Sequence, residues 1–193
     1  MSVSLDGLTE VLASPRLREH RGLGEPPFFI LSYEPRESVS TAVLRAKLPQ
    51  RLSERAITAL DIDLYDLTVE LLAERGLWDR VLSIESEVSK EELRELMQNV
   101  LDPETHLAPA IKARMADAEP FDLLILGGVG EVFPFVRSHS VLNNLARVVG
   151  EKPVLLFFPG EFAQGTSGAS LRLFGRVPND RFYRATDIRG LIA

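Results

Sequence analysis

Leu123-Leu-Ile-Leu126 and Val154-Leu-Leu-Phe-Phe158 are the two stretches of sequence that decide the fold. Both are unbroken apolar runs, and they lead directly into Gly127 and Pro159 respectively. Apolar runs without polar alternation are typical of parallel strands that are covered on both faces. A helix is expected between them over residues 138–149, so a crossover connection should join them. We therefore predict that these two strands are neighbours at the centre of a sheet.

Other segments extend this pattern of strands and helices along the chain. A capping box, Ser89 with Glu92, marks the start of the clearest helix. The last two strand-like segments have no helix between them, so they are expected to add to the sheet in antiparallel fashion. Further strands are predicted at 28–31, 60–64, 171–174 and 182–185, and helices at 5–12, 40–47, 53–57, 67–75, 90–101 and 107–118.

The pattern predicts a single α/β domain over residues 1–193, with a mainly parallel central sheet flanked by helices. Its layout should be P-loop-like or Rossmann-like, without Walker motifs and with an antiparallel C-terminal addition. The chain divides by composition into an acidic, helix-rich half, 1–120, and a half that carries the recognisable motifs, 121–193. Residues 1–120 contain 14 Lys and Arg against 22 Asp and Glu, and residues 121–193 contain 8 against 6.

Composition and charge exclude several classes of protein. The 193 residues are 45% hydrophobic and include no cysteine, which rules out disulfides, thiol nucleophiles and thiolate metal sites. The net charge of −6, without a basic stripe interleaved with aromatic residues, argues against direct nucleic-acid binding. No apolar run approaches the roughly 20 residues that span a bilayer. The amino terminus lacks the pattern of a signal peptide, so a cytoplasmic protein that does not enter the membrane is expected.

Two glycine-rich segments have the spacing of nucleotide-binding motifs only in part. In Gly160-Glu-Phe-Ala-Gln-Gly165-Thr166, a threonine stands where a Walker A loop has its lysine, and the segment that follows alternates like a strand. We expect a flexible surface loop there, and a phosphate cradle is the alternative. Gly127-Gly-Val-Gly130 is interpreted as a tight turn, because Phe133 occupies the position of the third glycine of a dinucleotide motif. No cofactor site is therefore predicted.

Candidate metal ligands and catalytic bases are sparse. Asp61, Asp63 and Asp66 carry ligands suited to a hard cation. However, the first two lie on the polar face of an alternating strand, and Asp66 is placed to cap the next helix, so no metal site is predicted. His139 lies near the start of a helix, and a capping or interface role is favoured over general-base work because no G-x-S-x-G nucleophile elbow accompanies it. No catalytic residue is predicted.

A protein-binding surface is predicted over Glu131–Arg147. Pro134 separates two phenylalanines at a point where the chain cannot continue a ladder or a helix, so at least one ring is expected to be exposed. Exposed aromatic rings beside arginine and amide groups have the composition of an interface hot spot. In the alternative interpretation, both rings cover the end of the core and Arg137 pairs with Glu131. The predicted partner-binding residues are Phe133, Phe135, Arg137, His139, Asn143, Asn144 and Arg147.

Several segments of the chain resemble the BrxB family, the small proteins of BREX bacteriophage-exclusion systems. The resemblance implies a cytoplasmic component of a bacterial defence system. It would work beside a site-specific DNA adenine methyltransferase, a large ATPase and PglZ, an alkaline-phosphatase-like protein. No catalytic motif carries over, and Gln164–Ala169 is longer than the loop expected at that place in the family. The segments that carry the resemblance are Gly128–Leu145, Pro153–Glu161, Ser170–Phe174 and Phe182–Ala185, together with Arg21–Gly24, Phe28–Pro35 and Asp61–Leu67.

From the residues and the resemblance together, we expect a noncatalytic scaffold of a BREX-type defence system. A PglZ-like protein is the expected partner, and the ATPase and the methyltransferase are further candidates. The scaffold would support host DNA methylation and phage restriction. The alternative is a degenerate nucleotide-binding or hydrolytic enzyme that uses the loops after Leu31, Leu126 and Phe158.

Overall fold

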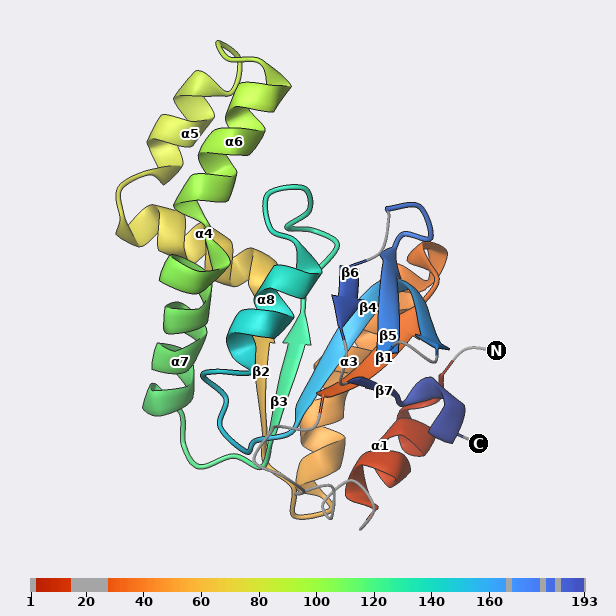
Figure 1. The fold of residues 1–193 in the computed structure, drawn as a ribbon. Coiled ribbons are helices and arrows are strands. Elements are labelled where there is room, and N and C mark those ends of the chain that lie inside the picture. Colours follow the sequence, from red (N-terminus) through yellow and green to blue (C-terminus); the bar gives the residue numbers. More distant parts are fainter. Residues whose placement is uncertain (1–2, 15–27, 166–167, 178–179, 183–184, 193) are drawn as a thin grey trace.

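The structure is a computed structural model that describes residues 3–14, 28–165, 168–177, 180–182 and 185–192. The described residues form a seven-stranded sheet whose main path runs β2-β3-β4-β1-β7, with every pair of neighbours on this path parallel (Figure 1). The predicted mainly parallel α/β sheet is thus confirmed. The two strands that decide the fold are neighbours, with Leu126 paired to Leu156. The strands of the path are β1 (Phe28–Tyr33), β2 (Ala59–Asp63), β3 (Leu123–Gly127), β4 (Val154–Gly165) and β7 (Ala185–Asp187).

Helices cover both faces of the sheet, and the strand residues divide between two hydrophobic clusters. In β1, Phe28 and Ile30 belong to one cluster, whereas Phe29 and Leu31 belong to the other. This division follows from the period of two along a strand, and it explains why Phe28–Leu31 has no polar positions. Helices α1 (Leu5–Ala13) and α3 (Ser38–Ser53) cover the second cluster; α4 (Leu64–Glu74), α6 (Lys90–Val100), α7 (Ala108–Asp117) and α8 (Ser138–Leu145) cover the first.

The connections leave the sheet in two directions. After β1 the chain passes through a short 3-10 turn, η1 (Pro35–Glu37), and α3 to reach β2 at the far edge of the sheet. After β3 it passes through α8, on the opposite face, to reach β4. In open α/β sheets, ligands bind at the carboxyl ends of the strands where such connections diverge. The carboxyl edge near β1, β3 and β4 is therefore the first place to look for a functional site.

The C-terminal region differs in part from the sequence-based prediction. Residues 160–165 are not a loop, because β4 continues to Gly165 and pairs with the antiparallel strand β5 (Gly168–Leu173). Gly160 is required there, since a Cβ would lie 2.2 Å from the carbonyl oxygen of Arg172. Gln164 pairs with Ala169, so the segment thought to be a long loop is the end of a hairpin, whose residues 166–167 lie outside the described part.

The antiparallel addition itself is confirmed for two strands. β5 pairs with β4, and β6 (Asp180–Phe182) pairs with β5, both in antiparallel fashion. β7 was not predicted as a separate strand, and it is parallel to β1 and extends the main path of the sheet beyond that strand. Residues 183–184, between β6 and β7, are outside the described residues. The sequence of residues 182–187 alone could not reveal that the chain changes direction between β6 and β7.

Several helices also differ from the prediction. The helix expected at 40–47 is longer, since α3 runs from Ser38 to Ser53 and contains Pro49, and the helix expected at 53–57 is absent because the chain forms a turn after Ser53. Helix α5 (Trp78–Ile84) was not predicted, and a π-helical turn, η2 (Pro103–Leu107), leads into α7. The capping box of Ser89 and Glu92 is present at the start of α6. No helix in the described part of the chain is both long and apolar enough to span a membrane.

Candidate functional site

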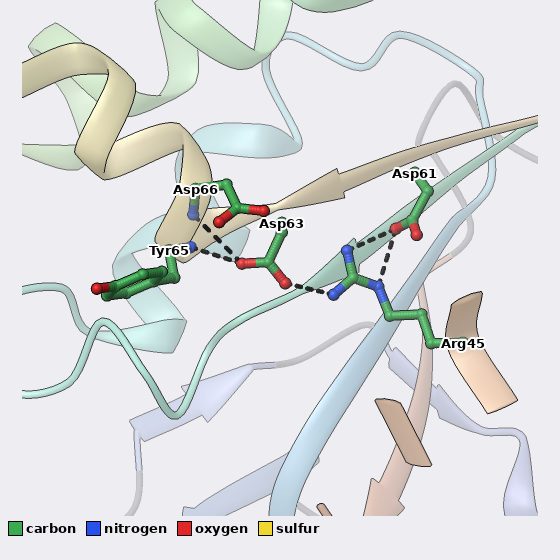
Figure 2. A network of polar contacts seen from close by, with 5 residues as sticks. All are labelled: Arg45, Asp61, Asp63, Tyr65 and Asp66. Carbon is green, nitrogen blue, oxygen red and sulfur yellow. Dashed lines mark hydrogen bonds and ion pairs between the residues drawn. The ribbon is translucent and has the colours of Figure 1, made fainter. Parts of the chain in front are cut away.

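A network of charged residues occupies the carboxyl edge of the sheet (Figure 2). Arg45, from α3, donates from Nε and Nη2 to Oδ1 of Asp61, at 2.9 and 2.6 Å. Its Nη1 donates to Oδ2 of Asp63 at 2.5 Å. The side chains of Asp61 and Asp63 are 26% and 27% exposed, and that of Arg45 is 14% exposed. One guanidinium therefore joins both carboxylates of β2 to the helix that crosses behind the sheet.

Asp63 also begins the next helix. Its Oδ1 accepts from the backbone N–H of Tyr65 at 2.9 Å and from that of Asp66 at 3.4 Å, which makes it the N-cap of α4. The prediction that Asp66 caps this helix is therefore wrong, because the N-cap is Asp63, three residues earlier in the chain. A helix N-terminus favours a negative charge, so Asp63 interacts with the helix on one side and with Arg45 on the other.

Two glycines of the turn after β3 leave room for this network. A Cβ on Gly127 would lie 1.8 Å from Nη1 of Arg45, and the three atoms nearest to it all belong to that guanidinium. Gly128 has φ +76°, and a Cβ there would lie 2.4 Å from Oδ1 of Asp63. The tight turn predicted from the glycines is thus present. Its glycines are needed because side chains from β2 and α3 pack against the backbone.

The charges in the network depend on one another. Burial by itself would lower the pKa of Arg45. The attraction of Asp61 and the hydrogen bonds with both aspartates outweigh this effect, so the pKa is raised above its ordinary value. Burial raises the pKa of Asp61 more than the charge and the hydrogen bonds of Arg45 lower it, so the net shift of this pKa is upward. Tyr33, at the end of β1, has its pKa raised to about 12 by burial and then by the charge of Glu131. Tyr33 is therefore neutral at physiological pH.

Sequence reasoning found two members of this network and missed the third. Asp61 and Asp63 were considered as metal ligands, but their oxygens are bonded to Arg45 and to backbone N–H groups. Within the described residues no group of three or more His, Cys, Asp or Glu side chains is arranged to hold a metal ion. Arg45 lies 16 and 18 positions before its partners, so no local pattern marks it. Only knowledge of which strand α3 crosses could have found it.

The loop after β3 was predicted to bind a partner, and the structure places its aromatic rings at half-buried positions. Val132 and Val136 are buried, and both phenylalanines pack against the same core cluster. The ring of Phe133 lies edge-on to that of Phe174, with 6.1 Å between ring centres. Neither ring is exposed, so the expectation of an exposed phenylalanine is wrong: both rings are half-buried against the core cluster. Arg137 is exposed.

Helix α8 carries the remaining predicted residues. Asn143 and Arg147 are exposed as predicted, and Arg147 forms an ion pair of 3.4 Å with Glu104. Asn144 is half-buried, and its side-chain amide donates to the carbonyl oxygen of Ser140 at 2.9 Å, so it is not simply an outward-facing group. His139 lies in the first turn of the helix, and its side chain is outside the described part.

Comparison with known proteins now identifies the family. A family model described as "BREX protein BrxB" matches residues 60–188. The chain is 30% identical over 183 residues to the BREX protein BrxB of Bacillus cereus (strain H3081.97), covering 94% of this chain and 93% of that protein.

The chain belongs to the BrxB family. A second relative, the BREX protein BrxB of Escherichia coli O9:H4 (strain HS), is 32% identical over 124 residues, which cover 64% of this chain and 59% of that protein. No solved structure gives a significant match. Membership makes the chain a component of a BREX system, and it confirms the resemblance found in the sequence. The partners and the chemistry of this component are a separate question.

Proposed function

We propose that this protein is a noncatalytic adaptor of its BREX system, which holds a PglZ-like protein in place beside the other components. Membership of the BrxB family supplies the context of the system. The position of Arg45 is the observation that supports the absence of catalysis in this proposal. Its guanidinium fills the space above Gly127, at the carboxyl end of β3, where an α/β sheet would bind a ligand.

The electrostatics of this edge also support the proposal. Asp61, Asp63 and Asp66 on the β2 side and Glu131 on the β3 side place four carboxylates around it. The guanidinium of Arg45 is already bonded to two of them. A phosphate group brought to this edge would meet net negative charge, since the backbone N–H groups at the start of α4 are bonded to Asp63. A nucleotide would therefore gain little here.

The first test is a calorimetric titration of the purified protein with Mg-ATP. We expect no binding in the micromolar range, because a cradle without a Walker lysine offers only backbone donors. Arg45→Ala is a useful companion variant, because it empties the space above Gly127. Micromolar affinity in the unaltered protein would overturn the noncatalytic reading in favour of the enzyme that uses the loops after Leu31, Leu126 and Phe158.

The second test concerns the partner. The tagged protein is purified from cells that carry the whole gene cluster, and the proteins that accompany it are identified and quantified. We expect the PglZ-like protein to copurify in a fixed ratio, with or without the ATPase and the methyltransferase. Copurification of no other product of the cluster, at low as well as moderate salt, would refute the adaptor function.

A further inference from the structure

A second surface lies beside the carboxyl edge, between the loop after β3 and a pair of helices. Helices α5 and α6, here called the helical arm, extend beyond the ends of the strands (upper left in Figure 1). The arm, α4 and the segment 131–135 enclose a pocket of about 250 Å³, here called the arm groove. On α4 the lining residues are Tyr65 and the residues three, four and seven positions after it. On α5 they are Trp78 and the residues three and four positions after it, and Glu85 lines the groove just beyond the end of this helix. Each of these helices therefore presents one whole face to the groove.

The floor of the arm groove belongs to the core, whereas its rim is open. Leu72, Met97 and Val132 line the groove and are buried in the core cluster. By contrast, Tyr65 is 47% and Leu82 is 50% exposed. No residue of α5 is buried, although the face that α5 turns to the groove is mainly apolar. Large apolar side chains that remain exposed around an apolar hollow mark an interaction surface.

The walls of the groove are held in place before anything binds. The side-chain amide of Gln98, in α6, donates to the carbonyl oxygen of Pro134 at 3.0 Å and so ties the arm to the loop after β3. Buried Met97 and Val132 pack in the same cluster just beneath this bond. A preformed groove binds more tightly than one that must be ordered on binding, because less conformational entropy is lost.

The charge of the groove selects its occupant. Among the described residues that line it, Glu85 and Glu131 alone are charged, and both are exposed. Neither forms an ion pair with any other described residue. The arm as a whole, residues 77–101, contains six Asp and Glu against three Lys and Arg. One carboxylate follows α5 and the other lies in the loop after β3, so an apolar segment with Lys or Arg side chains beside its apolar stripe complements the groove.

We propose that the arm groove binds an amphipathic helix of a protein partner, with apolar side chains against α4 and α5 and with Lys or Arg side chains against Glu85 and Glu131. The groove is lined by helices and a loop, without a strand edge that could pair with a partner's backbone. The bound segment must therefore satisfy its own backbone hydrogen bonds, as a helix does. This proposal rests on the adaptor function and specifies the surface and the chemistry of the segment that the adaptor holds.

The test compares matched variants in the copurification experiment. Leu82→Asp is expected to reduce capture of the partner about tenfold or more, because it places a charge in the apolar part of the groove. Val43→Asp is its control: Val43 is also 50% exposed, but it lies on α3, on the other face of the sheet. Glu85→Lys should weaken capture several-fold and reduce its salt dependence, whereas Glu95→Lys, on α6 outside the groove lining, should not. Unfolding midpoints in urea establish that each variant remains folded.

A photo-crosslinking residue at position 82 identifies what occupies the groove, independently of any loss of capture. We expect a crosslink to a partner segment with apolar residues at helical spacing and Lys or Arg beside them, and no crosslink from position 43. If the unaltered protein captures no partner, the adaptor function fails. If it captures a partner but Leu82→Asp and Glu85→Lys capture it equally well, only the groove proposal fails. A crosslink from position 82 to an acidic segment, or to a second copy of this chain, would also overturn it.

Discussion

Gly127→Ala should destabilise the protein when Arg45 is present, and should be neutral or stabilising when Arg45 is replaced by alanine. In the unaltered protein the new Cβ would lie 1.8 Å from Nη1 of Arg45, so the guanidinium must leave Asp61 and Asp63. Removing one partner from a buried ion pair costs about 3–5 kcal/mol. The two aspartate side chains keep 26% and 27% exposure, so water offsets part of this cost. We expect about 3 kcal/mol for Arg45→Ala, and about 2 kcal/mol for Gly127→Ala because the displaced arginine can reach water.

In the Arg45→Ala background the clash is absent. Gly127 does not have a positive φ, so alanine is compatible with its backbone, and the substitution should be neutral or stabilising by about 0.5 kcal/mol. The four proteins form a double-mutant cycle with an expected coupling energy of about 2 kcal/mol. Free energies of unfolding are measured by urea titration. Arg45→Ala alone should lower Tm by about 6–12 °C. If Gly127→Ala costs the same with and without Arg45, the reasoning about this contact is wrong.

Three further outcomes are expected. The side chain of Leu156 is 1% exposed, so Leu156→Asp buries an unpaired charge and should lower the free energy of unfolding by on the order of 4 kcal/mol or more. Leu96→Asp, on the exposed side of α6, is the control and should cost much less. An unchanged Tm for Leu156→Asp would show that Leu156 is not buried. The pKa of Tyr33 is raised from 10.0 to about 12, so its contribution to stability is complete below pH 10 and is lost as the pH rises towards 12. Urea midpoints of Tyr33→Phe should therefore fall less steeply over that range, and an equally steep fall would contradict the assignment. Charge reversal at Arg137 combined with Asn143→Ala should leave the protein folded but remove partner capture and phage protection; retention of both would exclude this surface as a contact.

The sequence predicted the elements whose signal is local. The apolar runs of β3 and β4 and the capping box at Ser89 each carry their evidence within a few residues, and the structure has them at the predicted places. It did not predict that β4 continues past Pro159, because Gly160 looks like a loop residue until its close approach to Arg172 is known. Local patterns reveal the periodicity of a segment, but they cannot show that a glycine is required by contact with a neighbouring strand.

The candidate sites show the same division. The sequence showed that Asp61 and Asp63 lie on the polar face of an alternating strand. It could not show that Arg45 binds them, because this contact depends on how α3 crosses the sheet. The arm groove was not predicted, because α5 is short and weakly patterned and its apolar face meets α4 and the loop after β3 only in the folded protein. Tertiary contacts, and not the propensities of single helices, create both features.

The position of β1 has a consequence for the synthesis of the protein. Phe28–Tyr33 leaves the ribosome well before Val154–Pro159 and Ala185–Asp187, the segments with which it pairs within the described sheet. During most of translation this strand is therefore an apolar segment with two unsatisfied edges, of the kind that aggregates or recruits chaperones. Completion of the sheet has to wait for residues beyond 153, and pairing between segments so far apart in the sequence makes folding slow. A cell would then benefit from producing this component slowly, or beside a partner that shields the nascent strand.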